Sequence, residues 1–202
     1  MKIICVGRNY VEHVHELGNE ITTEPLLFIK PATALLVNGA LKYPAFTKNL
    51  HYECELVLKV SKAGFNVLRG DAEEYYEEIS LGIDFTARDI QDKLKGKGLP
   101  WEKAKAFDGS AVVGHFIDKD HFKDIRNAGF QLIKNGITVQ DGNTALMIYT
   151  IDVLIEEITK YFTIEPGDLI FTGTPKGVGS TVKGDTYKGI LGDIEVLASE
   201  IV

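Results

Sequence analysis

The sequence predicts an α+β protein that is predominantly β, because stretches typical of strands outnumber those typical of helices. The clearest strand covers residues 51–60, where apolar and aromatic residues alternate along a run rich in β-branched side chains. Asn135-Gly136, between apolar runs at 130–134 and 137–140, predicts a tight hairpin turn. A single strongly amphipathic helix is predicted over residues 150–162.

The composition is that of one ordinary globular domain spanning residues 1–202, with 45% hydrophobic and 25% charged residues. A formal net charge of -7 and the lack of a run of Lys and Arg argue against a nucleic-acid partner. Lys93, Lys95 and Lys97 come closest to such a run, and their pattern is typical of the cationic end of a helix.

The N-terminal apolar run, residues 3–6, is too short for a signal peptide or a membrane span, so no membrane association is expected. Cys5 and Cys54 lie in strand-like contexts without metal-ligand spacing, which indicates reduced, buried thiols. We therefore expect a soluble, cytoplasmic protein.

In the first third of the chain, a short strand over residues 2–6 is followed by a helix over 10–17, ended by Gly18-Asn19. A strand bracketed by prolines covers residues 24–31, and a further short strand covers 41–44.

The middle of the chain predicts a helix over residues 72–79 with a solvated acidic face, then a buried strand over 81–86. Thr86 and Asp89 have capping-box spacing, which indicates a second helix that runs to about Lys95 and ends at glycines 96–98.

Towards the C-terminus, a turn at residues 166–168 leads into a strand over 169–172, and later strands cover 186–188 and 194–201. The glycine-rich loop 173–179 lacks the Gly-Lys-Ser/Thr of a P-loop, and no helix pattern follows it. Its amides could face an anion such as a substrate carboxylate, although a tight hairpin connection is the simpler account.

Glu53 and Glu55 project from the same face of the predicted strand 51–60, because side chains two apart share a face. Two neighbouring carboxylates repel, so they need solvent, a proton or a cation between them. A wet edge strand is the simpler interpretation of this pair alone, and a site for a hard divalent cation is the alternative.

Other candidate residues also have two interpretations. Asp84 lies in an apolar strand, where Arg88 or helix-start amides could pair with it, or where it could be a third metal ligand. Lys105 lies between small apolar residues as either a desolvated amine or an ordinary surface lysine. His13 and Glu16, three apart on a helix, could form a general base with its orienting carboxylate, or simply lie on a polar surface helix.

Taken in order, these segments resemble the fumarylacetoacetate hydrolase family in its small, single-domain, acylpyruvase-like form. The resemblance covers nearly the whole chain. It depends on Gly7-Arg8-Asn9-Tyr10 with His13 and Glu16, Phe28-Ile29-Lys30-Pro31, His51-Tyr52-Glu53-Cys54-Glu55-Leu56, Asp84-Phe85-Thr86-Ala87-Arg88-Asp89-Ile90-Gln91, Pro100-Trp101 with Lys105, Pro166-Gly167-Asp168 and Thr172-Gly173-Thr174-Pro175-Lys176-Gly177-Val178-Gly179.

The resemblance implies a rolled mixed β-sheet or sandwich with peripheral helices, usually as a homodimer. It also implies a set of site residues. The implied ligands of Mg²⁺ or Mn²⁺ are Glu53, Glu55 and Asp84; the implied catalytic residues are His13, Glu16 and Lys105, the first two on a mobile lid over residues 8–20; and the implied substrate contacts are Arg8, Arg88, Gln91 and Thr174.

The function that the resemblance implies is metal-dependent hydrolysis of a carbon–carbon bond in a small 2,4-dioxo acid, giving pyruvate and a carboxylic acid. Decarboxylation of oxaloacetate, or isomerisation of a 2-hydroxy-diene-dioate, would use the same metal site and is the alternative. A member without catalytic activity that serves as a binding protein is a third possibility, against which the complete set of acids and His13 argues.

Overall fold

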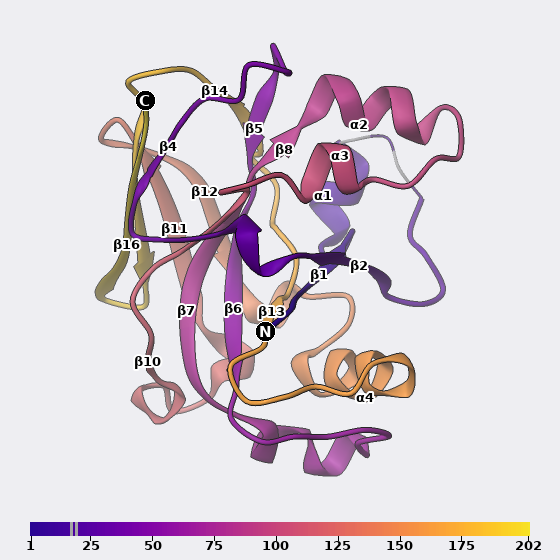
Figure 1. The fold of residues 1–202 in the computed structure, drawn as a ribbon. Helices are drawn as coiled ribbons and strands as arrows, with labels where there is room; N and C mark the ends of the chain where they lie inside the picture. Colours follow the sequence, from indigo (N-terminus) through magenta and orange to yellow (C-terminus); the bar gives the residue numbers. More distant parts are fainter. Residues whose placement is uncertain (17, 19) are drawn as a thin grey trace.

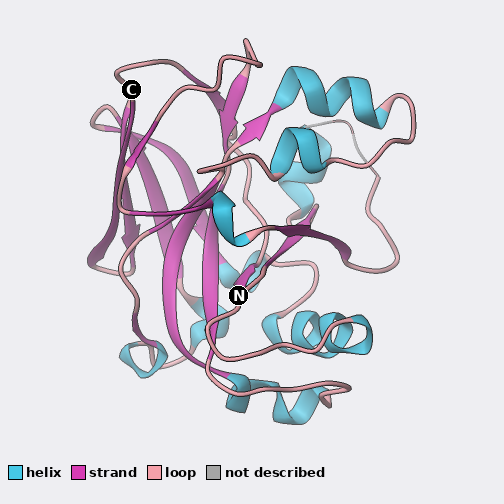
Figure 2. Ribbon diagram, in the orientation of Figure 1, coloured by secondary structure: helices cyan, strands magenta, loops and turns pink. Residues whose placement is uncertain are grey.

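The computed structural model describes residues 1–16, 18 and 20–202, and in this part of the chain strands predominate over short peripheral helices (Figures 1 and 2). Strands are grouped in three sheets that curl around one another, of which the largest contains eight strands. The predicted α+β class and the rolled mixed sheet with peripheral helices are therefore confirmed.

The eight-stranded sheet has the order β2-β1-β13-β6-β7-β9-β3, with β10 paired to β7. The sheet is mixed, since β1 and β13 run parallel, as do β3 and β9, whereas the remaining pairs are antiparallel. Its strands are β1 (Ile3–Gly7), β2 (Leu26–Lys30), β3 (Leu35–Val37), β6 (Cys54–Val60), β7 (Tyr76–Asp84), β9 (Ala111–Val113), β10 (Ile117–Asp118) and β13 (Leu169–Phe171).

A five-stranded sheet of order β12-β11-β15-β16-β4 packs beside it, and a small sheet of order β14-β5-β8 lies at one end. The predicted hairpin joins β11 and β12 through Asn135 and Gly136, whose φ angles of 51° and 82° are those of a primed turn. These strands are β4 (Ala40–Leu41), β5 (Leu50–Tyr52), β8 (Thr86–Ala87), β11 (Gly129–Lys134), β12 (Ile137–Asn143), β14 (Gly179–Thr181), β15 (Thr186–Leu191) and β16 (Ile194–Ile201).

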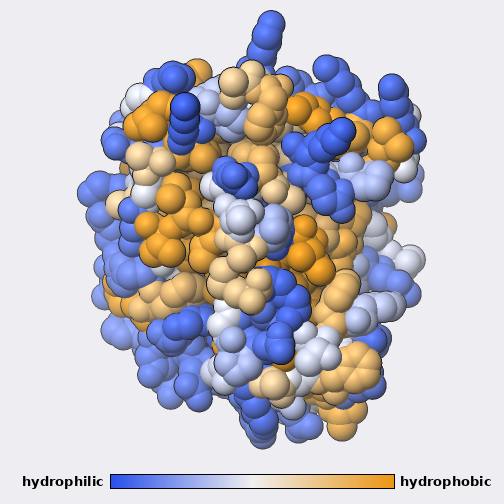
Figure 3. Space-filling model, viewed as in Figure 1, coloured by the Kyte–Doolittle hydropathy of each residue, from blue (hydrophilic) through white to orange (hydrophobic). Residues whose placement is uncertain are grey.

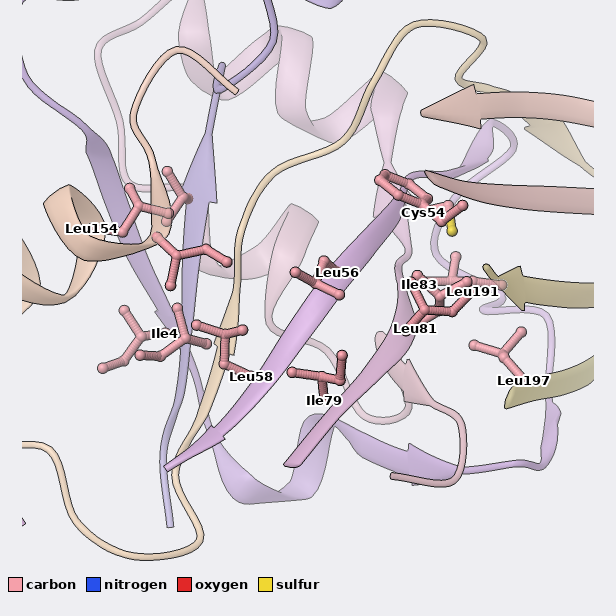
Figure 4. Close-up of a cluster of buried hydrophobic side chains, with 14 of the residues drawn as sticks. Ile4, Cys54, Leu56, Leu58, Ile79, Leu81, Ile83, Leu154, Leu191 and Leu197 are labelled. Carbon is pink, nitrogen blue, oxygen red and sulfur yellow. The ribbon is translucent and has the colours of Figure 1, made fainter. Parts of the chain in front are cut away.

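The hydrophobic core lies on one face of β6 and β7 (Figure 4). Leu56 and Leu58 on β6 are fully buried beside Ile79 and Leu81 on β7. Leu191 and Leu197 of the five-stranded sheet belong to the same cluster, as do Ile4 on β1 and Leu154 on α4. The alternation predicted for residues 51–60 thus gives one face of β6 to this core, while its other face carries Glu55 beside Val57, which belongs to a second buried cluster with Phe171.

The helices are α1 (Val11–Glu16), α2 (Arg88–Lys95), α3 (Glu102–Lys105) and α4 (Ile151–Tyr161). In Figure 1, α1, α2 and α3 gather at one end of the molecule, away from α4. Helix α4 buries the predicted apolar side with Ile151, Leu154, Ile155 and Ile158. Helix α1 begins near the predicted start, and the predicted last residue, Leu17, and the helix-ending Asn19 lie outside the described residues.

The strand predicted over residues 51–60 is wrong in one respect, because it breaks at Glu53 into β5 and β6. Strand β5 pairs with β14 and β8 in the small sheet, whereas β6 enters the large one. At the break, the Cys54 amide donates to Gln140 Oε1 at 2.9 Å instead of to a neighbouring strand. The change of sheet therefore frees Glu53 from a regular strand position.

The helix predicted over residues 72–79 is also wrong. A 3-10 segment, η2 (Arg69–Tyr75), is followed directly by β7. Pairing of β7 with β6 along its length, including Ile79 opposite Leu58, overrides the local helical propensity of the acidic run. The charged side chains Glu73, Glu74 and Glu77 are exposed, as predicted.

The capping box predicted at the start of α2 does not form. The residue before the helix is Ala87, which offers no side-chain cap. The Asp89 carboxylate accepts instead from the Thr47 hydroxyl at 2.5 Å and from the Lys48 amide at 3.2 Å. The spacing of Thr86 and Asp89 fits a capping box, but the Asp89 carboxylate is hydrogen-bonded to the distant loop that contains Thr47 and Lys48. The helix ends at Gly96, as predicted.

Hydrophobic residues reach the surface in separate areas interrupted by hydrophilic ones on the face seen in Figure 3. Among the described residues, no helix combines the length and apolar character needed to cross a membrane. Both cysteines are free and buried, as predicted. The homodimer stays a prediction, since the structure describes a single chain.

Asp185 holds two turns of the five-stranded sheet together and is only 5% exposed. Its carboxylate accepts from the Val182 amide at 2.7 Å and the Asn135 side chain at 2.7 Å, and lies 2.8 Å from Lys134 Nζ. Burial alone would raise the pKa of Asp185, but these donors outweigh burial and lower the pKa to about 2.

We predict that Asp185→Ala lowers the free energy of unfolding at pH 7 by about 2–4 kcal/mol, since it leaves buried donors unpaired. Because the folded pKa is depressed, this contribution is complete above about pH 4 and declines as the pH falls towards 2. Urea denaturation of both proteins between pH 3 and pH 7 measures it. Asp193→Ala, at an exposed position in the turn between β15 and β16, is the control, and an equal loss in both variants would contradict the prediction.

Candidate active site

Three buried carboxylates meet where β6 and β7 lie side by side. Glu53 is at the break before β6, Glu55 is on β6, and Asp84 is the last residue of β7. The Asp84 amide donates to the Glu53 carbonyl at 2.8 Å, which fixes the two segments together. One oxygen from each carboxylate lies within 4.8 Å of the others. The side chains converge as the metal-site interpretation requires, and the wet edge strand is excluded because none is more than 6% exposed.

Two buried cations from neighbouring helices contact these acids. The Lys105 ammonium lies 2.8 Å from Glu53 and 2.7 Å from Asp84. The Arg88 guanidinium donates to the other oxygen of Glu53 and, at 2.5 Å, to Gln91 Oε1. Of the two interpretations of Lys105, the desolvated amine is correct, since the residue is 3% exposed.

A third cation, Lys30, was not assigned a role by sequence reasoning. It is fully buried on β2, with its ammonium 2.7 Å from Asp84 Oδ1 and 3.0 Å from the Ser110 carbonyl. The partners proposed for Asp84 from the sequence, Arg88 or helix-start amides, are therefore wrong, and its partners are Lys30 and Lys105. The sequence feature that could have identified Lys30 is a lysine within an otherwise apolar strand.

The buried charged groups shift one another's pKa values, and the two glutamates are shifted in opposite directions. Burial would raise the pKa of Glu53, but Lys105 and Arg88 outweigh it and hold this pKa well below its usual range. Burial raises the pKa of Glu55, and the nearby Asp84 and Glu53 raise it further. Burial would lower the pKa of Lys105, yet Asp84 and Glu53 raise it, so the ammonium stays protonated at neutral pH.

Glu55 has no cationic partner. Its carboxylate accepts from the Gly173 amide at 2.7 Å, and among the described residues no Lys or Arg nitrogen lies within 4 Å of it. Three converging carboxylates, one of them without a counter-charge, form a hard oxygen donor set that suits Mg²⁺ or Mn²⁺. The residues therefore fit a divalent ion.

Helix α1 carries the predicted His–Glu pair. His13 is 5% exposed, and its Nδ1 lies 3.3 Å from Glu16 Oε2. Burial lowers the pKa of His13 against the opposing effects of Glu53 and Glu16, so the ring is neutral at neutral pH. The interpretation as a polar surface helix is wrong for His13 and correct for its neighbour His15, which is exposed.

The glycine-rich loop binds two carboxylates of the protein itself. The Gly173 amide donates to Glu55, and the Gly177 amide donates to Glu16 at 3.1 Å. Gly173 has a φ of 101°, and a Cβ there would lie 2.6 Å from Asn9 Cβ, so only glycine fits. The amides do face anions as the sequence suggested, and these anions include a candidate ligand and the partner of the candidate base.

Two buried amide side chains position these elements, and neither was predicted. Asn9 is fully buried and ties the start of α1 to the Thr172 carbonyl at 2.8 Å and to the Tyr149 amide at 2.7 Å. Gln140 joins the Cys54 amide to the Thr174 hydroxyl, which it contacts at 2.9 Å. Nothing in the sequence separates such amides from ordinary polar residues.

One pocket brings nearly all the predicted residues together. Its lining includes nine of them, namely Arg8, His13, Glu53, Glu55, Asp84, Arg88, Gln91, Lys105 and Thr174. Glu16 acts on this pocket only through His13. The remaining lining residues, to which the sequence assigned no role, are Val6, Gly7, Phe28, Lys95 and Trp101.

Comparisons with known proteins place the chain in a family. The family model for the fumarylacetoacetate (FAA) hydrolase C-terminal domain matches residues 2–201. The mitochondrial oxaloacetate tautomerase of Bos taurus is 44% identical over 91% of this chain and 83% of its own length. The mitochondrial oxaloacetate decarboxylase of Dictyostelium discoideum is 40% identical over 95% of this chain and 89% of its own.

A solved structure shows the same fold. Fumarylpyruvate hydrolase from Pseudomonas aeruginosa, in complex with Mn²⁺ and pyruvate, superposes with a TM-score of 0.94 at 35% identity, over all of this chain and 89% of that one. Since the relatives from Bos taurus and Dictyostelium are named as mitochondrial proteins, the cytoplasmic location stays a prediction. The family match over almost the whole chain confirms the resemblance seen in the sequence: the protein belongs to the fumarylacetoacetate hydrolase family.

Proposed function

We propose that the protein is a divalent-metal-dependent enzyme that enolises oxaloacetate-type 2-oxo acids. The observation that carries this proposal is the convergence of three buried carboxylates and a neutral, buried His13 on one pocket. The named activities of the bovine and Dictyostelium relatives support the choice of oxaloacetate over a 2,4-dioxo acid.

Glu53, Glu55 and Asp84 are the proposed ligands of Mg²⁺ or Mn²⁺. Bound there, the ion would act as a Lewis acid that draws electrons towards the 2-oxo group of the substrate. Lys30 and Lys105 hold Asp84 in place, and Arg88 holds Glu53, so the donor set is ordered by the protein before any ligand binds.

His13 is the proposed base. Its Nδ1 faces Glu16, so a proton on Nδ1 leaves Nε2 free to accept. His13 Nε2 would take a proton from C3 of the substrate, and the resulting enolate would gain a proton on its 2-oxo oxygen to become the enol; the reverse transfers restore the keto form. The Lys105 ammonium would stabilise the developing negative charge on the 2-oxo oxygen. Thr174 and Arg88 line the pocket where a substrate carboxylate would lie.

Helix α1 belongs to the proposed lid, residues 8–20. Support comes from its contacts with the glycine-rich loop, which are made at the surface by Glu12 with Lys176 at 3.0 Å and by Glu16 with the Gly177 amide. These contacts with the loop are exposed, but Asn9 and Val14 hold the start and one face of the helix in the protein interior, so the proposed lid motion has to break buried as well as surface contacts.

Hydrolysis of 2,4-dioxo acids is the second candidate. The likeness to fumarylpyruvate hydrolase favours it, and the same base would then activate water in place of removing a substrate proton. Decarboxylation of oxaloacetate differs from both, because it needs the electron sink but no base.

The first prediction concerns the metal. We expect Glu55→Gln to abolish Mn²⁺ binding, measured by calorimetry. The same variant should enolise oxaloacetate at least a thousandfold more slowly, measured by the absorbance of the enol. The variant should fold, because Glu55 has no cationic partner to leave unpaired. Glu78→Gln, in a surface ion pair on β7, is the control. Full activity after treatment with EDTA would contradict the metal role.

The second prediction concerns the base. His13→Gln should lower tautomerisation and any hydrolysis by about 10²–10⁴-fold while sparing decarboxylation, since a general base contributes that much. His15→Gln, exposed on the same helix, should leave all three rates unchanged. Equal loss of all three activities in His13→Gln would show that the residue is structural.

The third prediction concerns pH. Because the neutral ring is the proposed active form and burial lowers the pKa of His13, the acid limb of kcat/KM should have its midpoint below pH 6.5. Glu16 raises this pKa, so Glu16→Gln should move the acid limb to still lower pH. A limb above pH 6.5, or one that persists in His13→Gln, would exclude His13 as its origin.

A further inference from the structure

Two cations at the edge of the catalytic pocket take no part in its ion pairs. Lys30, Arg88 and Lys105 are already engaged by Glu53 and Asp84, while Glu55 has no cationic partner among the described residues. Arg8 and Lys95 line the same pocket, and among the described residues neither has an acidic partner within 4 Å. Arg8 and Lys95 are therefore two pocket cations that form no ion pair with the acids of the pocket.

Lys95 lies in the last turn of α2 and is half-buried. Its ammonium is 5.3 Å from the centre of the Trp101 ring, over which it is held. Asp92, one turn earlier on the same helix, would be an easy partner, yet the two side chains do not pair. The lysine is thus directed to the pocket and not to its own helix.

Arg8 is held in an unfavourable conformation. Its φ of 60° is rare for a residue other than glycine, asparagine or aspartate, and its buried Nε has no hydrogen-bond partner. Strain and an unpaired donor at a candidate active site indicate a group that is positioned for a ligand. Burial, together with Arg88 and Arg8 nearby, lowers the pKa of Lys95, which shows how closely the cations lie.

The position of the two residues defines the part of the substrate that they meet. Arg8, Lys95 and Trp101 line both the catalytic pocket and an open hollow of about 580 Å³ outside it, together with Gly98 and Leu99. They therefore stand at the entrance, on the side away from the core, where the end of a substrate distant from its 2-oxo group must lie.

We propose that Lys95, together with Arg8, binds the second carboxylate of the substrate and makes the enzyme selective for 2-oxo dicarboxylic acids. The inference rests on the proposed function and adds Lys95 as its specificity-determining residue. A neutral apolar tail would instead suit the neighbouring hollow beyond Trp101, lined by Leu26, Leu27 and Leu99.

The test compares oxaloacetate with its 4-methyl ester, two enolisable substrates that differ by one charge. Wild type should prefer the diacid, and Lys95→Gln should lower kcat/KM for the diacid at least tenfold, mainly through KM, with less than a threefold change for the ester. Lys95→Arg should restore most of the preference, because it keeps the charge. Lys93→Gln, exposed on the same helix, is the matched control and should alter neither substrate.

Calorimetry with pyruvate in the presence of Mn²⁺ separates a failure of the proposed function from a failure of the proposed role of Lys95. Pyruvate has no second carboxylate, so its affinity should be the same in wild type and Lys95→Gln. If wild type binds no pyruvate and turns over neither substrate, the proposed function fails. If wild type is active but Lys95→Gln loses activity equally with the diacid and the ester, the role of Lys95 is excluded. The role is also excluded if wild type and Lys95→Gln both prefer acylpyruvates with apolar tails.

Discussion

The burial of three carboxylates at the junction of β6 and β7 is the constraint on which the site depends. Unpaired, such a group of charges would cost more than a domain of this size can offset. The protein meets the cost with cations from three different elements: Lys30 on β2, Arg88 on α2 and Lys105 on α3. These ion pairs therefore tie a strand and two helices to the acids, and of the three acids only Glu55 has no cationic partner among the described residues.

The break at Glu53 explains how a strand can present two carboxylates to one point. In a continuous strand, the two α-carbons would lie about 7 Å apart with parallel side chains. Because β5 leaves for the small sheet, Glu53 can accept from Arg88 and Lys105 on the helix side while Glu55 remains bonded to Gly173. The small sheet thus has a direct effect on the geometry of the site.

Sequence reasoning could predict the features that depend on local pattern. Periodicity gave α4 and the face of β6 that enters the core, and turn chemistry gave the hairpin at Asn135 and Gly136, because each is decided within a few residues. It failed where distant partners decide: β6 draws residues 76–79 into a strand, Thr47 takes the Asp89 carboxylate from its capping box, and Asp84 pairs with Lys30, which is 54 positions away. Charge pairing across a sheet leaves no trace in spacing, so the cations were harder to find than the acids.

The site is divided between the buried sheet with its packed helices and helix α1. This division helps to explain why related proteins are named for different activities. The carboxylates and their cations lie on the buried sheet and the helices packed against it, whereas the proposed base, His13, lies on α1, which contacts the glycine-rich loop at the surface. A fixed electron-withdrawing centre would serve tautomerisation, decarboxylation and hydrolysis alike. What differs among these reactions is whether His13 meets a substrate proton, a water molecule or neither. On the proposed roles of these residues, the reaction would be decided by the placement of α1 and by the groups at the entrance that orient the distal end of the substrate, and not by the carboxylates themselves.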